Sequence, residues 1–322
     1  MWSVFQNLDS LDMKILKELI KNNVMPFPSI ALRKSFRSIG RNIHVDQGTV
    51  RNRIRRFKQN GLLKEFYLGV NPSLFGLKLA SLTFDVRPQS EKEKIRKEVS
   101  LMDRTLLVCD YLGPKLGTVF CYEDEQDLKK TARRITRMAN SEHVVCQNKP
   151  FLQCDKLKLT PSDWRIIGSL QRGDAWKKSY SIVARETGLS TKTVKKRIDL
   201  MVHEGAIYLL TSVNLGSFEG FVPADLVIFY QAPEFRDKVV EAVRDFLEEM
   251  LVFADVEDEQ HGYFALAVPN IARIREIQNW AQRSDGVGSV HVEILHDILS
   301  LRRFYDEQVR AKVELPIKVL AR

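Results

Sequence analysis

The sequence contains two copies of one pattern, and this internal repeat limits the possible folds more than any other feature. Residues 49–54 (TVRNRI) match residues 193–198 (TVKKRI) at an offset of 144, and the apolar pattern of residues 8–19 matches that of residues 159–170 at an offset of 151. The first copy is therefore seven residues longer, and we expect the extra residues in the Pro-rich stretch 24–28. Such self-similarity predicts two copies of one architecture.

The first part of each copy has a helical pattern. In copy one, Asp9 or Ser10 is the expected cap of a first helix, whose apolar residues follow helical spacing. A second helix is expected from about residue 30 or 35 to residue 43. Asp46 is the expected N-cap of a third helix, which Gly61 ends.

In copy two, Ser190 and Gly205 are the corresponding start and stop of the third helix. The stretches that follow the glycines, residues 62–70 and 206–213, are rich in residues that favour strands. Three helices with a short turn before the third, followed by a β-hairpin, predict a winged helix-turn-helix in each copy.

The second part of each copy alternates strand and helix patterns. The order is βαββαβ both times, which is that of a ferredoxin-like domain. In copy one, strands are expected at 79–86, 106–111, 117–122 and 143–147, with helices at 91–101 and 125–139. In copy two, strands are expected at 226–230, 252–256, 263–268 and 289–295, with helices at 235–249 and 271–283. The tail, residues 297–322, has no counterpart in copy one, and its apolar spacing indicates a further helix.

These patterns predict an α+β fold in which two winged helix-turn-helix domains alternate with two ferredoxin-like βαββαβ domains. The expected boundaries are 1–76 and 158–220 for the winged helix-turn-helix domains, 77–157 for the first ferredoxin-like domain, and 221–322 for the second one with the tail.

Two sequence motifs carry a family resemblance. Residues 8–19 read LxxxDxxILxxL, and residues 180–198 read YSIVAxxxGLSxxTVxxRI. With the βαββαβ order that follows, the chain resembles the Lrp/AsnC family of prokaryotic transcription regulators over nearly its whole length, twice. Copy one departs from the motif where Gly40 replaces a small Ala, His44 a turn Gly and Asp46 a capping Ser. His tolerates positive φ and Asp caps well, so we expect the helix-turn-helix to be retained.

The resemblance implies a DNA-binding transcription regulator whose third helices enter the major groove of double-stranded DNA. Family members assemble as dimers through their ferredoxin-like sheets. A fused chain is therefore expected to form that pair internally and to pair again as a homodimer, which is a pseudo-tetramer of repeat units.

The charge distribution also points to nucleic acid. Lys and Arg number 50 against 41 Asp and Glu, a net charge of +9. Residues 33–58 hold nine basic residues and one acid, and residues 177–199 hold seven basic residues and two acids. These windows carry +8 and +5, so the rest of the chain is −4. Positive charge focused on the expected reading helices is the footprint of a nucleic-acid reader.

Other features limit the cellular setting. No apolar run approaches the roughly 20 residues that span a bilayer, and the N-terminus lacks the pattern of a signal peptide. The four cysteines form no CxxC pair, which favours free thiols in a reducing compartment. We expect a cytoplasmic, nucleoid-associated protein without a membrane partner.

The third helix of copy one carries side chains suited to base edges, because Arg pairs well with guanine and Asn or Gln with adenine. The helix of copy two is rich in Lys, which favours phosphate contacts, so copy one is expected to supply more of the specificity. The candidate DNA-binding residues are Gln47, Arg51, Asn52, Arg55, Arg56, Lys58 and Arg37 in copy one and Thr191, Lys192, Lys195 and Lys196 in copy two. Of these, Arg56, Lys58 and Arg37 are expected at phosphates.

Arg53 and Arg197 are expected partly on the inner face of their helices. A structural ion pair with Asp12 and Asp163, respectively, is the alternative to a DNA contact.

A small-molecule effector is the other partner that the family resemblance implies. Family members bind amino acids or similar metabolites beside a Gly-x-x-Asp turn between the second and third strands. The corresponding stretches here are residues 113–116 (GPKL) and 258–261 (DEQH), which lack the acid that would hold an amino group. An amino-acid effector is therefore not favoured, and a different ligand, or none, fits as well.

The enzymatic alternative is similarity to the siroheme decarboxylases, which share this architecture and carry a His-Asn-Tyr-type cluster near the second strand. Residues 106–111 and 252–256 contain no His, so we expect no enzyme, no catalytic residue and no cofactor. A protein-interaction scaffold is a third hypothesis.

Histidines suggest only loose metal pairs. His291 and Glu293 share a strand face that His296 and His261 are able to approach, and His143 lies near Cys146. We interpret them as polar strand-face or surface residues and expect no metal site.

Overall fold

A computed structural model describes residues 6–20, 35–142, 144–149, 154, 157–173, 178–255 and 258–314 of the chain. The Pro-rich stretch 24–28, expected to hold the extra residues of copy one, lies outside these ranges, as do His143 and Lys177. The helices are α1 (Ser10–Ile20), α2 (Phe36–Ile43), α3 (Gln47–Gln59), α4 (Lys92–Ser100), α5 (Glu125–Ala139), α6 (Pro161–Gln171), α7 (Tyr180–Thr187), α8 (Thr191–His203), α9 (Arg236–Leu247), α10 (Ile271–Arg283) and α11 (Arg303–Glu314).

The strands lie between these helices in the predicted order. They are β1 (Gln6–Asn7), β2 (Leu63–Val70), β3 (Lys78–Asp85), β4 (Thr105–Tyr111), β5 (Lys115–Tyr122), β6 (Val144–Lys149), β7 (Ile207–Val213), β8 (Phe218–Glu219), β9 (Val222–Tyr230), β10 (Leu251–Asp255), β11 (His261–Val268) and β12 (Val287–Ser300). Two βαββαβ units follow the two sets of three helices, as the sequence predicted.

The two ferredoxin-like units share one sheet. Its strand order is β10-β11-β9-β12-β4-β5-β3-β6, so each unit has the order second, third, first, fourth strand that its connections require. The junction is β12, whose first part pairs with β9 and whose last part pairs with β4, both antiparallel. The expected strand at 289–295 was therefore too short at both ends, because β12 pairs with two neighbouring strands, β9 and β4.

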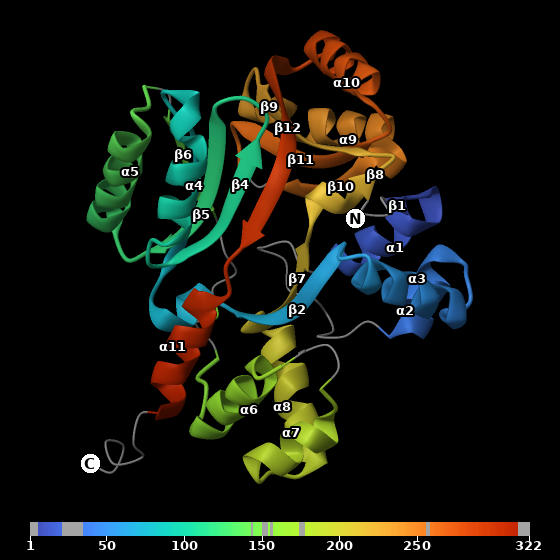
Figure 1. Ribbon diagram of the computed structural model, residues 1–322, viewed down its shortest axis with the longest axis vertical. Coiled ribbons are helices and arrows are strands. Elements are labelled where there is room, and N and C mark those ends of the chain that lie inside the picture. Colours follow the sequence, from blue (N-terminus) through green and yellow to red (C-terminus); the bar gives the residue numbers. More distant parts are fainter. Residues whose placement is uncertain are drawn as a thin grey trace.

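Helices cover one face of this sheet. Figure 1 shows α4 and α5 over the strands of the first unit and α9 and α10 over those of the second. Leu128 and Ile135 of α5 share one buried apolar cluster with Leu82 and Phe84 of β3, and the second unit has an equivalent cluster. Alternating strand residues face these helices because successive side chains of a strand point to opposite faces.

The predicted β-hairpin wings are wrong. The strand that follows α3, β2, pairs antiparallel with β7, the strand that follows α8, from Leu63 opposite Val213 to Val70 opposite Ile207. Within the described residues each copy thus supplies one strand of a shared two-stranded ribbon. A single strand leaves its backbone groups unpaired, and the second copy satisfies them.

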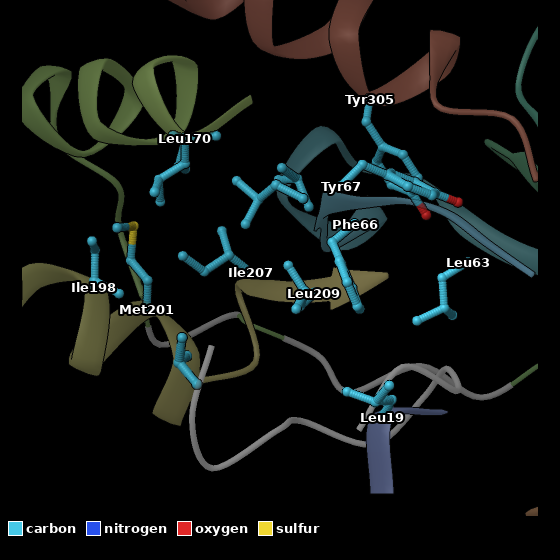
Figure 2. Close-up of a cluster of buried hydrophobic side chains, with 14 of the residues drawn as sticks. Leu19, Leu63, Phe66, Tyr67, Leu170, Ile198, Met201, Ile207, Leu209 and Tyr305 are labelled. Atoms are coloured by element: carbon cyan, nitrogen blue, oxygen red, sulfur yellow. The ribbon is translucent and has the colours of Figure 1, made fainter. Parts of the chain in front are cut away.

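One apolar core unites the two copies around this ribbon. Figure 2 shows Leu63 and Phe66 of β2, Leu209 of β7, Leu19 of α1 and Ile198 of α8 converging on one cluster. Both helix-turn-helix units therefore pack on the same ribbon. Close packing of this kind resists independent movement of its parts.

The tail forms the predicted helix, although residues 297–300 belong to β12 rather than to it. Helix α11 packs on α6 and β2. The hydroxyl of its Tyr305 lies 3.0 Å from that of Tyr208 on β7, and Arg302, just before α11, forms a 3.1 Å ion pair with Glu65 of β2. Gly168 of α6 gives α11 room, since a Cβ there would lie 3.1 Å from Val313 Cγ2. In the part of the chain that is described, no helix is both long and apolar enough to cross a membrane.

A buried carboxylate links the two halves of the sheet. Asp225 of β9 is 2% exposed and lies opposite Glu293 of β12. The hydroxyl of Tyr111, from β4, donates to Asp225 Oδ2 at 2.7 Å, and Lys115 of β5 forms an ion pair with Glu293. Burial raises the pKa of Asp225 to about 6, although hydrogen bonds from Tyr263 and Tyr111 oppose the shift.

This carboxyl predicts a specific pH dependence. Its pKa is higher in the folded chain than the roughly 3.9 of an unfolded Asp, so its contribution to stability falls as the pH rises from about 4 to about 6. Asp225→Asn should remove this pH-dependent loss of stability, because Asn does not titrate. Relative to wild type, the free energy of unfolding of the variant should rise by up to about 3 kcal/mol between pH 4 and pH 7, measured by denaturant titration.

Tyr111→Phe is the contrasting variant. It removes a hydrogen bond that lowers the pKa of Asp225 but keeps the titrating carboxyl, so its stability should still fall as the pH rises. A difference between wild type and Asp225→Asn that stays constant with pH would contradict this account.

Candidate nucleic-acid interface

The turn before α3 has the geometry that the sequence predicted despite its departures from the motif. His44 adopts the left-handed conformation at φ 58°, and Asp46 Oδ1 accepts hydrogen bonds from the backbone N–H groups of Gly48 at 2.7 Å and Thr49 at 3.0 Å. A Cβ on Gly40 would lie 2.5 Å from the carbonyl oxygen of Val45, so the tight turn needs glycine there. These contacts fix the direction of α3 relative to α2.

Copy two forms the same turn with the residues of the motif itself. Gly188 is left-handed at φ 71°, and Ser190 Oγ accepts a hydrogen bond from the N–H of Thr193 at 3.0 Å. Both predicted N-caps of the third helices, Asp46 and Ser190, are confirmed. Each third helix thus begins with a side chain that satisfies its free N–H groups.

The exposed face of α3 carries four of the candidate residues. Gln47, Arg51, Asn52 and Arg55 are exposed, opposite the buried Val50, Ile54 and Phe57 of the same helix. The contacts that these side chains make are long: Arg55 Nη1 lies 3.4 Å from Asn52 Oδ1, and the Arg51 guanidinium lies 5.7 Å from the centre of the Phe36 ring. The side chain of Arg37, on α2, is also exposed.

Two other candidates are held in contacts within the protein. Arg56 Nη2 forms a 2.6 Å ion pair with Asp12 Oδ2, and Lys58 Nζ lies 4.7 Å from the centre of the Phe66 ring. The structure therefore does not bring Arg56 and Lys58 to the same exposed face as Arg51.

Arg53 and Arg197 form the structural ion pairs that were the alternative to a DNA contact. Arg53 Nη1 lies 2.9 Å from Asp12 Oδ1, and Arg197 Nε lies 2.5 Å from Asp163 Oδ1, with both carboxylates fully buried. Burial alone would raise the pKa of Asp163, but hydrogen bonds from Arg197 and Thr160 hold it below its ordinary value. Each pair ties the third helix to the first helix of its unit.

The exposed face of α8 differs from that of α3 at one important position. Thr191, Lys192, Lys195 and Lys196 are all exposed. At the repeat offset of 144 residues, however, Arg55 of α3 corresponds to Asp199 of α8, whose Oδ2 lies 3.3 Å from Lys195 Nζ. Sequence reasoning counted this acid without placing it on the reading face, although the repeat offset gives its position.

The expected effector turns do not form a recognisable amino-acid site. Residues 113–116 span the end of the turn from β4 to β5 and the first two residues of β5, where Lys115 pairs with Glu293. In the second unit, Asp258 accepts hydrogen bonds from the N–H groups of Gln260 at 2.7 Å and His261 at 3.2 Å. That carboxylate is thus used within its own turn.

The histidines considered as metal ligands are dispersed. His261 and His291 flank the ring of Phe229, whereas His296 Nδ1 lies 3.5 Å from Asp110 Oδ2. In the described ranges, no three His, Cys, Asp or Glu residues are placed to hold a metal ion. The cysteines are free thiols, and Cys146 is exposed rather than buried in its strand.

Comparisons with known proteins agree with the motifs. The AsnC-type helix-turn-helix domain family matches residues 8–58. The HTH-type transcriptional regulator Ptr1 of Methanocaldococcus jannaschii is 36% identical over 91 residues, which are 28% of this chain and 55% of Ptr1. The chain therefore contains an AsnC-type helix-turn-helix domain. It spans about half the length of Ptr1, whereas an uncharacterized HTH-type transcriptional regulator of Pyrococcus horikoshii, PH1692, is 25% identical over 146 residues, 44% of this chain and 92% of that protein.

A solved structure shows that the whole two-copy arrangement occurs elsewhere. The siroheme decarboxylase NirDL aligns over 94% of this chain and 99% of its own, with a TM-score of 0.56 and 10% sequence identity. At that identity the likeness concerns the fold alone.

The reading face of α8 yields a prediction for Asp199→Asn. This variant removes a carboxylate that would repel phosphates and frees Lys195 from its partner, so affinity for duplex DNA at low salt should rise about three- to tenfold. Fluorescence anisotropy measures this. Asp245→Asn, which changes the same charge on the exposed side of α9, is the matched control and should have little effect; equal gains from the two variants would contradict the placement of Asp199.

Proposed function

We propose that this chain is a DNA-binding transcription regulator that reads the major groove of double-stranded DNA with α3 and α8. The observation that carries the proposal is that both third helices have a capped N-terminus and an exposed face rich in polar and cationic side chains. The names of Ptr1 and PH1692, both HTH-type transcriptional regulators, support it. A helix of this kind inserts its N-terminal residues toward base edges.

The two third helices, α3 and α8, are proposed to make different kinds of contact with DNA. Arg51 and Arg55 are able to pair with guanine, and Gln47 and Asn52 with adenine, so α3 supplies most of the base discrimination. The Lys-rich face of α8 contacts phosphates, which positions the protein without selecting a sequence. Arg37 lies on the exposed side of α2, where it would meet the backbone beside the reading helix.

The shared ribbon supports the action of both units on one duplex. Because β2 and β7 pair with each other, α3 and α8 are held in a fixed relation instead of on separate tethers. Fixed spacing removes the entropy cost of ordering a second reading unit after the first has bound.

We propose domain boundaries at residues 76, 157 and 220, a homodimer of the fused chain, and action at the nucleoid in the cytoplasm. Any effector would be a small molecule other than an amino acid, because residues 113–116 (GPKL) and 258–261 (DEQH) depart from the Gly-x-x-Asp turn.

We also propose that the chain is not an enzyme, despite the fold that it shares with NirDL. The described residues of β4 and β10 contain no histidine to serve as an acid or base there. The relatives' names point to regulation, while the likeness to NirDL concerns architecture and not a site.

The reading helix of copy one is tested by Arg51→Ala. Its side chain is exposed and packs on nothing buried, so the fold should be unchanged while discrimination between preferred and scrambled duplexes falls by about 1–3 kcal/mol. Lys195→Ala with Lys196→Ala is the contrasting variant and should weaken binding to all sequences about equally. Competition anisotropy on a selected site measures both; unchanged base preference in Arg51→Ala would show that α3 is not the reading helix.

A further inference from the structure

A second cationic surface lies outside the two helix-turn-helix units, on α5. Five of its side chains are exposed cations, and the described residues show no ion pair for any of them. They are Lys129, Lys130, Arg133, Arg134 and Arg137, here called the α5 face. Neither charge-rich window of the sequence includes it, because the acids at the start of α5 lower the local net charge.

Helix geometry gathers these five cations on one side. At about 100° per residue, they fall within an arc of about 140°, opposite the buried Leu128, Ile135 and Ala139. Along the axis they extend about 12 Å, a length over which a duplex presents several phosphates. The α5 face is thus a continuous cationic stripe on an exposed, firmly packed helix.

The fold itself does not require this stripe. The repeat counterpart of α5 is α10, which exposes Arg275 and Arg283, while its Arg273 forms a 2.7 Å ion pair with Glu276. Both helices contribute buried apolar residues to the cluster beneath their own unit, although their outer faces differ. The unpaired cations of α5 are therefore not needed for packing.

The composition of the α5 face identifies its partner class. A protein partner is normally anchored by buried apolar or aromatic side chains at the centre of the interface. In the described part of the chain, the exposed large apolar residues are Leu101, Leu112, Val145, Ile271 and Val313, none of them on α5. A surface made of cations without apolar anchors suits phosphates, whose binding is driven by release of counterions.

We propose that the α5 face binds the phosphate backbone of duplex DNA outside the segment that α3 and α8 read. This inference rests on the proposed function. Figure 1 shows α5 and α3 at opposite sides of the molecule, so the α5 face meets DNA that flanks the reading site and follows the protein surface. Such contacts add affinity and favour curved DNA, but they do not read sequence.

The test compares duplexes of two lengths, about 20 and about 60 base pairs, centred on one selected site. The test variant combines Lys130→Gln, Arg133→Gln, Arg134→Gln and Arg137→Gln, since Gln has a similar helix propensity. The matched control combines Lys97→Gln, Arg244→Gln, Arg275→Gln and Arg283→Gln. It removes the same charge from exposed positions scattered over α4, α9 and α10. Anisotropy titrations across salt give the affinity and its salt dependence.

On the long duplex, the α5 variant should lose about tenfold in affinity at low salt, and its slope of log affinity against log salt should be shallower by about 2 to 4. Its affinity for the short duplex should equal that of the control variant. Equal behaviour of the two variants on both lengths would overturn the proposal. So would unchanged long-duplex binding together with lost binding to polyglutamate, which would identify an acidic protein as the partner.

The short duplex separates this proposal from the proposed function. In one outcome, Arg51→Ala leaves short-duplex affinity and base preference unchanged while the α5 variant still loses affinity for the long duplex. That outcome would contradict base reading by α3 and support DNA binding by the α5 face. If wild type binds neither duplex at low salt, both are overturned.

Discussion

The pairing of β2 with β7 determines where the other parts of the molecule lie. Each strand follows the third helix of its own unit, and neither has another strand partner among the described residues. Their ribbon collects apolar side chains from α1, α6, α8 and α11 into one core (Figure 2). Because backbone hydrogen bonds fix the register of the ribbon, they also fix the relation between the two helix-turn-helix units. The fused chain is in this sense one folded object and not two tethered copies.

The helices and most strands were predictable because their signals are local. Caps such as Asp46 and Ser190, and apolar residues at helical or alternating spacing, act within a few residues of the chain. The pairing of β2 was not predictable in this way. The sequence of a strand after a helix is similar whether its partner strand follows directly or lies in another repeat. The full length of β12 was missed for the same reason. Likewise, periodicity placed Arg53 and Arg197 near the inner face, but only the structure resolves their ion pairs with Asp12 and Asp163.

The two repeats have kept one scaffold and have diverged on their outer faces. The buried Asp–Arg pair recurs in both units and holds the first helix to the third. On the exposed side, Arg55 of α3 is replaced by Asp199 of α8, and the cations of α5 have few counterparts on α10. Outer positions are free to change because substitutions there cost little folding stability. This asymmetry is what separates a fused pair of subunits from a symmetric dimer.

Binding of the wild-type chain to a pool of duplex DNA, titrated across salt with increasing heterologous competitor, tests the central claim most directly. If α3 and α8 read DNA, log affinity falls steeply with log salt, because phosphate contacts release counterions. A fraction of the pool should also resist the competitor, because base contacts add to those at phosphates. A steep slope without a resistant fraction would contradict sequence reading, and the absence of binding at low salt would contradict a DNA-binding role altogether.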